Sequence, residues 1–478
     1  MQALHRHLFQ LRQTRLLRLV AVTAAVLLGY TTVYLLYLRD DFPDDGVSLS
    51  SNPSTNYVNS TCSVDLDRLR AHAPNASVVQ YARLEIVVAR TRTFTGYSDS
   101  LNVSLPTYQS VRLDTDRKRE RLPEERCATS VTIPGPVDSA PANASHLIFG
   151  VATSMERLNA SLDAFAHWAG GTNAQIVAVV DKGGSLLTPT MERANALGIR
   201  LTVVEQQDEV LDRYFSLIRI LMDRREESTQ WAVLIDDDTF FPSMQNLVNR
   251  LASYDATQPQ YIGALSEDMS QMYGAGHIAY GGAGVFLSIP LMQELHEVFD
   301  DCYLFKGAGD GMVAQCIYEH TTTKLTWDRD LHQLDLRGDA SGFYESGRPL
   351  PLSLHHWKSW HHADMVALGK VAAVCGEGCL LRRLQLADDW YLVNGFSVIK
   401  YSRPLRDPNV MEQTWEDSQY QGVGPFAYSL GPLRGRDEDK VSLRMREAQV
   451  EGPGRVRQVY VREDEDAQVL DVVWKVAS

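Results

Sequence analysis

The stretch that decides the fold class runs from Leu147 to Val180 and reads LIFGVATSMERLNASLDAFAHWAGGTNAQIVAVV. It begins and ends with short continuous apolar runs, LIFGVA and QIVAVV, which are typical of strands buried on both faces. Between these runs, apolar side chains recur every three or four residues, as on one face of a helix: Met155, Leu158, Leu162, Phe165 and Trp168.

The same alternation continues to Ile235. TPTMERANALG (188–198) predicts a helix, IRLTVVE (199–205) a strand, 211–224 a longer helix and WAVLI (231–235) a fourth strand. Strands that alternate with amphipathic helices predict an α/β domain, with a mostly parallel, Rossmann-like sheet and helices on both faces. Such open sheets bind ligands just beyond the carboxyl ends of their strands.

Composition and charge narrow the class of protein. The chain has 478 residues, of which 44% are hydrophobic, as is usual for globular proteins and not for disordered ones. Lys plus Arg number 46 against 60 Asp plus Glu, so the net charge is −14. That sign does not suit a surface that neutralises phosphate backbones, and we therefore expect no nucleic-acid partner.

The N-terminal region predicts a membrane anchor. LVAVTAAVLLGYTTVYLLYL (19–38) has no charged residue and is long enough to span a bilayer as a helix. Arginines precede it and aspartates follow it, which predicts a cytosolic N-terminus and a lumenal body in the Golgi or ER. The alternative, a cleaved signal peptide, would have a shorter apolar region and a small-residue cleavage site.

Two further features agree with a lumenal body. Five Asn-x-Ser/Thr sequons follow the anchor, at Asn59, Asn75, Asn102, Asn143 and Asn159. All six cysteines also follow it, which permits up to three disulfides of undetermined pairing. The CGEGC run (375–379) suits a small closed loop, two partners for distant thiols or, less readily, a zinc site.

The sequence divides into six regions. We expect a cytosolic tail (1–18), the anchor (19–38), a flexible stem (39–61), an N-terminal lumenal extension (62–145), the catalytic domain (146–400) and a small β-rich appendage (401–478). Within the extension, the charged stretch DTDRKRERLPEER (114–126) predicts a solvated helix or loop.

Three adjacent carboxylates, Asp236, Asp237 and Asp238, follow the buried WAVLI run directly. Their mutual repulsion at a strand end is costly unless a cation lies among them. Carboxylate oxygens suit hard divalent ions, which keep open positions for water and for the oxygens of a diphosphate. The alternative is a solvated acidic turn that precedes a helix near Pro242.

Four ordered blocks carry a resemblance to a known family. WAVLIDDDTFF (231–241), IAYGGAGVFLS (278–288), GAGDGMVAQCI (307–317) and SLHHW (353–357) resemble the fringe-like β-1,3-glycosyltransferases in order and spacing. The resemblance covers about 147–356. It implies a GT-A fold, a UDP-sugar donor, Mn²⁺ and inversion at the anomeric carbon.

The resemblance also implies roles for the acidic run and the histidines. Asp238 is expected to bind the metal, Asp237 to lie close to the sugar or ribose, and Asp236 to support the cluster. His355 is expected to be the second metal ligand, with His356 as the open alternative. A structural role for this histidine pair is the competing interpretation.

Four further residues are expected at the donor site. Gly281 and Gly282 would let the backbone approach the sugar, although a tight turn explains them equally. Asp310 is the candidate base, although relatives carry two adjacent acids where this chain has Gly-Asp-Gly, which also suits a plain turn. Asp181 matches an acid that binds uracil or ribose, or is a loop carboxylate.

These observations lead to one main hypothesis. We expect a metal-dependent inverting enzyme that moves a hexose or N-acetylhexosamine from a UDP-sugar to a glycan, glycoprotein or glycolipid acceptor, in β-1,3 linkage. The alternative is a glycan- or nucleotide-sugar-binding scaffold that kept the fold and lost turnover. A two-metal phosphodiesterase would need further His and Asp ligands that the sequence does not offer at strand ends.

Overall fold

The computed structural model describes residues 62–91, 98–123, 128–136, 141–304, 309–416, 427–462 and 467–477. The tail, the predicted span at 19–38 and the stem lie outside these ranges. Within them, no helix combines the length and the apolar character that crossing a bilayer requires.

The predicted α/β sheet is present and has seven strands. β7 pairs in parallel with β10 on one side and with β8 on the other, and β8 pairs in parallel with β9. β12 runs antiparallel to both β10 and β11, so the sheet is mixed, with its parallel part where the sequence predicts it. The strand order is β13 (Leu325–Trp327), β11 (Tyr261–Gly263), β12 (Val285–Ser288), β10 (Trp231–Ile235), β7 (Leu147–Thr153), β8 (Gln175–Val180), β9 (Arg200–Glu205).

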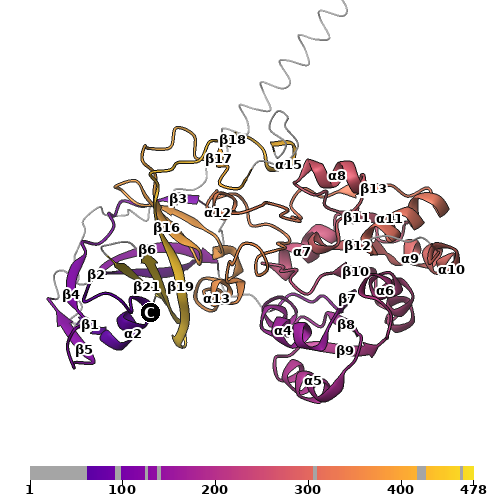
Figure 1. The fold of residues 1–478 in the computed structure, drawn as a ribbon, viewed down its shortest axis with the longest axis horizontal. Coiled ribbons are helices and arrows are strands. Elements are labelled where there is room, and N and C mark those ends of the chain that lie inside the picture. The colour runs from indigo at the N-terminus through magenta and orange to yellow at the C-terminus, as the bar shows by residue number, and fades with distance from the viewer. Residues whose placement is uncertain are drawn as a thin grey trace, which may run out of the picture. The chain divides into compact units, whose positions relative to one another are not determined.

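Helices cover both faces of this sheet (Figure 1). α4 (Met155–Ala169), α5 (Leu187–Ala196) and α7 (Met244–Leu251) pack on one face, and α6 (Val210–Arg224), α9 (Ile289–Glu297) and α11 (Gly309–His320) pack on the other. Along β8, Ile176 and Ala178 face the first group, whereas Val177 and Val179 face the second. This alternation explains why the strand is a continuous apolar run.

A second, ten-stranded sheet combines segments that are distant in the sequence. β2 pairs in parallel with β21, with Gln80 opposite Gln468, and β6 (Thr129–Pro136) pairs with the other edge of β2. The predicted N-terminal extension (62–145) and C-terminal appendage (401–478) both contribute strands to this sheet, together with β14–β16. Its main path is β3 (Ser98–Ser100), β14 (Arg383–Gln385), β15 (Trp390–Val393), β16 (Ser397–Lys400), β19 (Val441–Gly452), β20 (Arg455–Arg462), β21 (Gln468–Val476), β2 (Val78–Thr91), β4 (Gln109–Arg112).

The charged stretch 114–126 is not a helix or loop throughout. Part of this charged stretch is a strand, β5 (Arg119–Leu122), which pairs antiparallel with β1 (Cys62–Asp65). Its side chains alternate between exposed and partly buried, so backbone pairing and not an apolar face defines it.

The short strands β17 (Met411–Glu412) and β18 (Leu433–Arg434) form a further pair. The remaining helices are α2 (Leu66–His72), α8 (Met269–Ala275), α10 (Phe299–Cys302), α12 (Ser341–Tyr344), α13 (Met365–Gly369), α14 (Ala372–Cys375) and α15 (Ala427–Leu430), with 3-10 turns η1 (Gly184–Leu186), η2 (Gly281–Ala283) and η3 (Glu377–Cys379).

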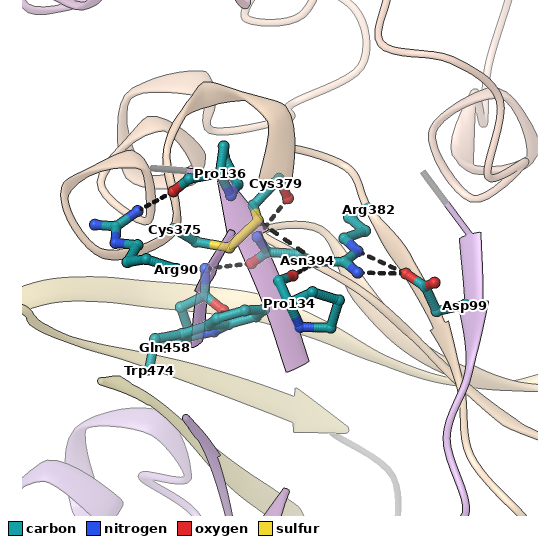
Figure 2. Close-up of a disulfide and its surroundings, with 10 residues drawn as sticks. All are labelled: Arg90, Asp99, Pro134, Pro136, Cys375, Cys379, Arg382, Asn394, Gln458 and Trp474. Carbon is teal, nitrogen blue, oxygen red and sulfur yellow. Dashed lines mark hydrogen bonds and ion pairs between the residues drawn. A yellow bond between two sulfur atoms is a disulfide. The ribbon is translucent and has the colours of Figure 1, made fainter. Parts of the chain in front are cut away.

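The CGEGC run is a closed loop and not a zinc site, because Cys375 and Cys379 form a disulfide between α14 and η3 (Figure 2). Buried polar groups fix this loop to the ten-stranded sheet: Asn394 donates to the Cys379 carbonyl oxygen at 2.6 Å, and the buried Arg382 donates to Asp99 at 2.8 Å. A second described disulfide joins Cys302 in α10 to Cys316 in α11.

Candidate metal and donor site

The triple-aspartate corner is a tight turn at the carboxyl end of β10. The Asp236 backbone N–H donates to the Thr239 hydroxyl at 3.0 Å, and the Thr239 N–H donates to the Asp236 carbonyl oxygen at 3.1 Å. The same Thr239 hydroxyl donates to the Gly282 carbonyl oxygen at 2.9 Å. Thr239 therefore holds the corner against the glycine turn that precedes β12.

An isolated β-bridge brings the histidines to this corner. Phe240 and Leu354 exchange backbone hydrogen bonds of 2.9 and 2.8 Å. As a result, His355 Nε2 lies 3.0 Å from Asp238 Oδ1 and 3.3 Å from Asp236 Oδ2. The structure thus unites residues that are more than a hundred positions apart in the sequence.

His355 is buried and held in one orientation. Its Nδ1 lies 3.2 Å from the Gln333 carbonyl oxygen, to which it can only donate, and Nε2 faces the carboxylates. Burial alone would lower the pKa of His355, but Asp236 and Asp238 outweigh it and raise the pKa to about 10. Hydrogen bonding from His355 likewise lowers the pKa of Asp238 well below its usual value, although burial opposes this shift.

His356 lies beside His355 but has other partners. Its Nε2 lies 3.2 Å from Asp335 Oδ1 and its Nδ1 lies 3.2 Å from the Ser359 hydroxyl. Ser359 in turn donates to Asp238 Oδ2 at 3.0 Å. Both ring nitrogens of His356 therefore have partners other than the corner's carboxylates, whereas His355 Nε2 faces Asp236 and Asp238 directly.

The donor set fits a divalent metal ion. Asp238, His355 and His356 each offer one ligand atom, and these atoms lie within 4.8 Å of one another. Two ligands about 2.1 Å from an ion and at right angles to each other are about 3.0 Å apart, which equals the distance between Asp238 Oδ1 and His355 Nε2. Carboxylate with imidazole is a suitable ligand pair for Mn²⁺.

Asp237 has a different environment from its neighbours. It is buried and accepts two hydrogen bonds from Arg157, at 2.6 Å from Nε and 2.5 Å from Nη2, and one from the Thr153 hydroxyl. This paired geometry satisfies the carboxylate within the protein. Sequence reasoning missed both of these partners, although Thr153 ends β7 and Arg157 lies in the first turn of α4, next to the strand end that borders the predicted crevice.

Asp310 lies in the first turn of α11 and faces the glycine turn. Its carboxylate accepts from the Gly281 N–H at 3.1 Å and from the Gly311 N–H at 2.8 Å. Burial raises the pKa of Asp310 above its usual value, and the charge of Asp236 adds to this effect. A buried carboxylate with a raised pKa is suited to accept a proton.

Tyr214, on α6, lies between the two segments that hold Asp310. A Cβ on Gly281 would be 2.8 Å from the Tyr214 hydroxyl, and a Cβ on Gly309 would be 2.6 Å from its ring. Both glycines are therefore needed to accommodate this tyrosine. Its role at the site was missed, because nothing in the local sequence links α6 to these turns.

Asp181 occupies the place that the sequence predicts, directly after β8 at the same edge of the sheet as Thr153. It is exposed, and its side chain has no hydrogen bond or ion pair with any residue that the structure describes. The position is therefore open to a ligand, but the structure does not connect it to the metal corner.

Comparison with known proteins finds similarity over parts of the chain. Residues 270–366, which include Gly281, Asp310 and His355, match the model of the family "Protein of unknown function, DUF604". A 149-residue stretch, 30% of this chain, is 29% identical to a human protein named beta-1,3-glucosyltransferase. The aligned stretch covers only 28% of that relative's length.

Two solved glycosyltransferase structures are similar to part of this chain at low identity. A mannosyltransferase from Pyrobaculum calidifontis, solved with GDP-Man and Mn²⁺, is 14% identical over 45% of this chain and 64% of its own, with a TM-score of 0.27. The glycosyltransferase GlyE from Streptococcus pneumoniae is 14% identical over 47% of this chain and 58% of its own, with a TM-score of 0.30. Similarity of this size carries no argument about this chain.

Proposed function

We propose that this protein is a metal-dependent, inverting glycosyltransferase that transfers a hexose or N-acetylhexosamine from a UDP-sugar to a glycan acceptor. The observation that carries the proposal is the corner in which His355 Nε2 lies 3.0 and 3.3 Å from Asp238 and Asp236 at the end of a buried strand. The mixed α/β sheet fits a GT-A-like fold. The human relative's name supports the reaction class and suggests a β-1,3 linkage.

Asp238 and His355 would hold the metal ion, which we propose is Mn²⁺. When bound, such an ion stabilises the negative charge that develops on a leaving diphosphate. His356, Ser359 and Gln333 keep the two ligands oriented through the hydrogen bonds described above, as outer partners of metal ligands commonly do.

Asp310 is the proposed base. Inversion requires a group that takes the proton from the acceptor hydroxyl as its oxygen attacks the anomeric carbon from the side opposite the departing UDP. The carboxylate is held by the Gly281 and Gly311 N–H groups, and its raised pKa improves its ability to keep that proton.

The cellular setting is part of the same proposal. The charge asymmetry around 19–38 and the sequons support a type II protein in the Golgi or ER membrane, with the described domains in the lumen. In that compartment the proposed enzyme would meet both a UDP-sugar donor and a glycan acceptor. Protease protection of the full chain in sealed microsomes tests this placement.

A donor screen tests the function. The full chain is incubated with a panel of UDP-sugars, with Mn²⁺ or with chelator, and UDP release is measured. We expect metal-dependent release with at least one donor, abolished by Asp238→Ala and retained by Asp330→Ala as an acidic control outside the corner. Sugar or nucleotide binding without any release would instead support the scaffold alternative.

A further inference from the structure

Arg213, in the first turn of α6, is a buried cation without a counter-ion. It is 7% exposed, and it forms no ion pair within the part of the chain that the structure describes. Its guanidinium contacts two carbonyl oxygens: Nη1 donates to that of Asp208 at 2.7 Å, and Nη2 lies 3.5 Å from that of Thr153. Its Nε is buried and has no hydrogen-bond partner among the described residues.

The protein does not offset the charge of Arg213. A buried charge is costly to the fold unless an opposite charge lies close to it. The two carbonyl oxygens accept hydrogen bonds but carry no net negative charge. Asp237, which Thr153 links to this region, is already bound by Arg157 through two hydrogen bonds. An anionic ligand would supply the missing charge.

Arg213 lies at the edge of the sheet where a ligand is expected. β8 and β9 extend the sheet on one side of β7, and β10 then pairs with the other side of β7. Such a reversal is a topological switch point, and open α/β sheets bind ligands at the carboxyl ends of the strands that flank it. Thr153 ends β7 and Asp236 follows β10, so the contact with Thr153 places the guanidinium at this edge.

The guanidinium also lies near the surface. Asp208, whose carbonyl oxygen accepts from Nη1, is exposed, whereas Thr153 is buried. The group therefore lies between a surface loop and the buried end of β7. A planar guanidinium can donate paired hydrogen bonds to a phosphate group, which makes arginine well suited to this anion.

We propose that Arg213 binds the diphosphate of the nucleotide-sugar donor, whose negative charge compensates the buried guanidinium. The inference rests on the proposed function, because the donor supplies the diphosphate. Arg213 would hold the diphosphate from the β7 side of the switch point, and the metal held by Asp238 and His355 would hold it from the β10 side. The edge of the sheet carries three aspartates, so a second positive group would help it accept an anion.

Nucleotide binding tests the inference without requiring turnover. In the full chain with Mn²⁺, calorimetric titration should show UDP affinity at least about tenfold lower in Arg213→Gln, which removes the charge but keeps an N–H donor. Arg213→Lys, which keeps the charge, should bind UDP more tightly than Arg213→Gln. If Arg213→Gln does not fold, Arg213→Met replaces it. Arg219→Gln is the matched control, because it removes an exposed arginine of the same helix that pairs with Asp300, and it should bind UDP as wild type does.

Two results would overturn the inference. One is an unchanged UDP affinity in Arg213→Gln. The other is an equal loss of Mn²⁺ affinity in a titration without nucleotide, since Arg213 would then only support the metal corner.

An error in the proposed donor gives a different result. If wild type binds GDP or inorganic pyrophosphate but not UDP, the UDP-sugar assignment is wrong, and the same variants are compared with the anion that binds. If wild type binds none of these three anions, the inference is rejected, and UDP release in the donor screen decides the proposed function separately.

Discussion

Gly282 lies directly against the imidazole of His355. A Cβ at this position would be 2.1 Å from His355 Nδ1 and 2.2 Å from Cε1, much closer than any Cβ contact allows. The absence of a side chain at Gly282 therefore sets where the imidazole lies, and so where Nε2 meets Asp236 and Asp238. Gly282 therefore acts by leaving room for His355, the proposed metal ligand. The sequence-based expectation was that glycine here lets the backbone approach a sugar.

Gly282→Ala should abolish metal binding. The methyl group must displace the buried His355, and such overpacking costs about 1–3 kcal/mol of stability. We expect loss of the Mn²⁺ signal in calorimetric titration and a lower melting temperature. Gly274→Ala, where a Cβ would have open space in helix α8, is the matched control; it should leave Mn²⁺ binding unchanged and should not lower the melting temperature. Normal Mn²⁺ affinity in Gly282→Ala would contradict His355 as the ligand.

Asp310→Asn should separate activity from stability. Loss of a general base lowers kcat by about 10²–10⁴-fold, whereas donor binding should persist. Burial raises the pKa of Asp310 in the folded state. The carboxyl group therefore contributes stability that is fully present below its unfolded-state pKa and is lost as the pH rises through its folded-state pKa. The asparagine variant should therefore lose this pH dependence and melt higher than wild type at neutral pH.

The pH profile of wild type gives a second readout. The acid limb of kcat should lie above the ordinary aspartate pKa of about 3.9, since Asp310 must be ionised to accept the proton. An acid limb at the ordinary value, or transfer at the normal rate in Asp310→Asn, would exclude Asp310 as the base.

Local periodicity predicts the elements around the corner but not their long-range partners. The apolar runs at β7 and β10 and the three-and-four repeat of α4 appear where the sequence places them. The pairing of Gln80 with Gln468 could not be predicted, because the alternation of apolar and polar residues within a strand does not indicate which other strand it pairs with. The same holds for Arg157 and Asp237, since an ion pair between distant residues leaves no local pattern.

Arg382→Ala should destabilise the ten-stranded sheet without affecting the metal corner. The side chain is fully buried and donates to Asp99 and, at 2.6 Å, to the Pro134 carbonyl oxygen (Figure 2). Its removal leaves a cavity and an unpaired carbonyl, at a cost of roughly 2–4 kcal/mol. The measurement is the midpoint of denaturant unfolding. Arg112→Ala, which removes an exposed ion pair with Asp114, should show no measurable change.

Tyr214→Phe should make the protein more stable. The Tyr214 hydroxyl is buried and has no hydrogen-bond partner among the described residues, so its desolvation is uncompensated. Removing it should stabilise the fold by up to about 1 kcal/mol and raise the melting temperature. Tyr81→Phe is the matched control, because the buried Tyr81 hydroxyl donates to Asp471 at 2.7 Å and its loss should lower stability by about 1–2 kcal/mol. Equal losses in both variants would show that Tyr214 has a partner in solution. If Tyr214→Phe is more stable but binds the donor more weakly, the Tyr214 hydroxyl contacts the substrate. A polar group that lowers the stability of the fold is usually kept because it serves the function.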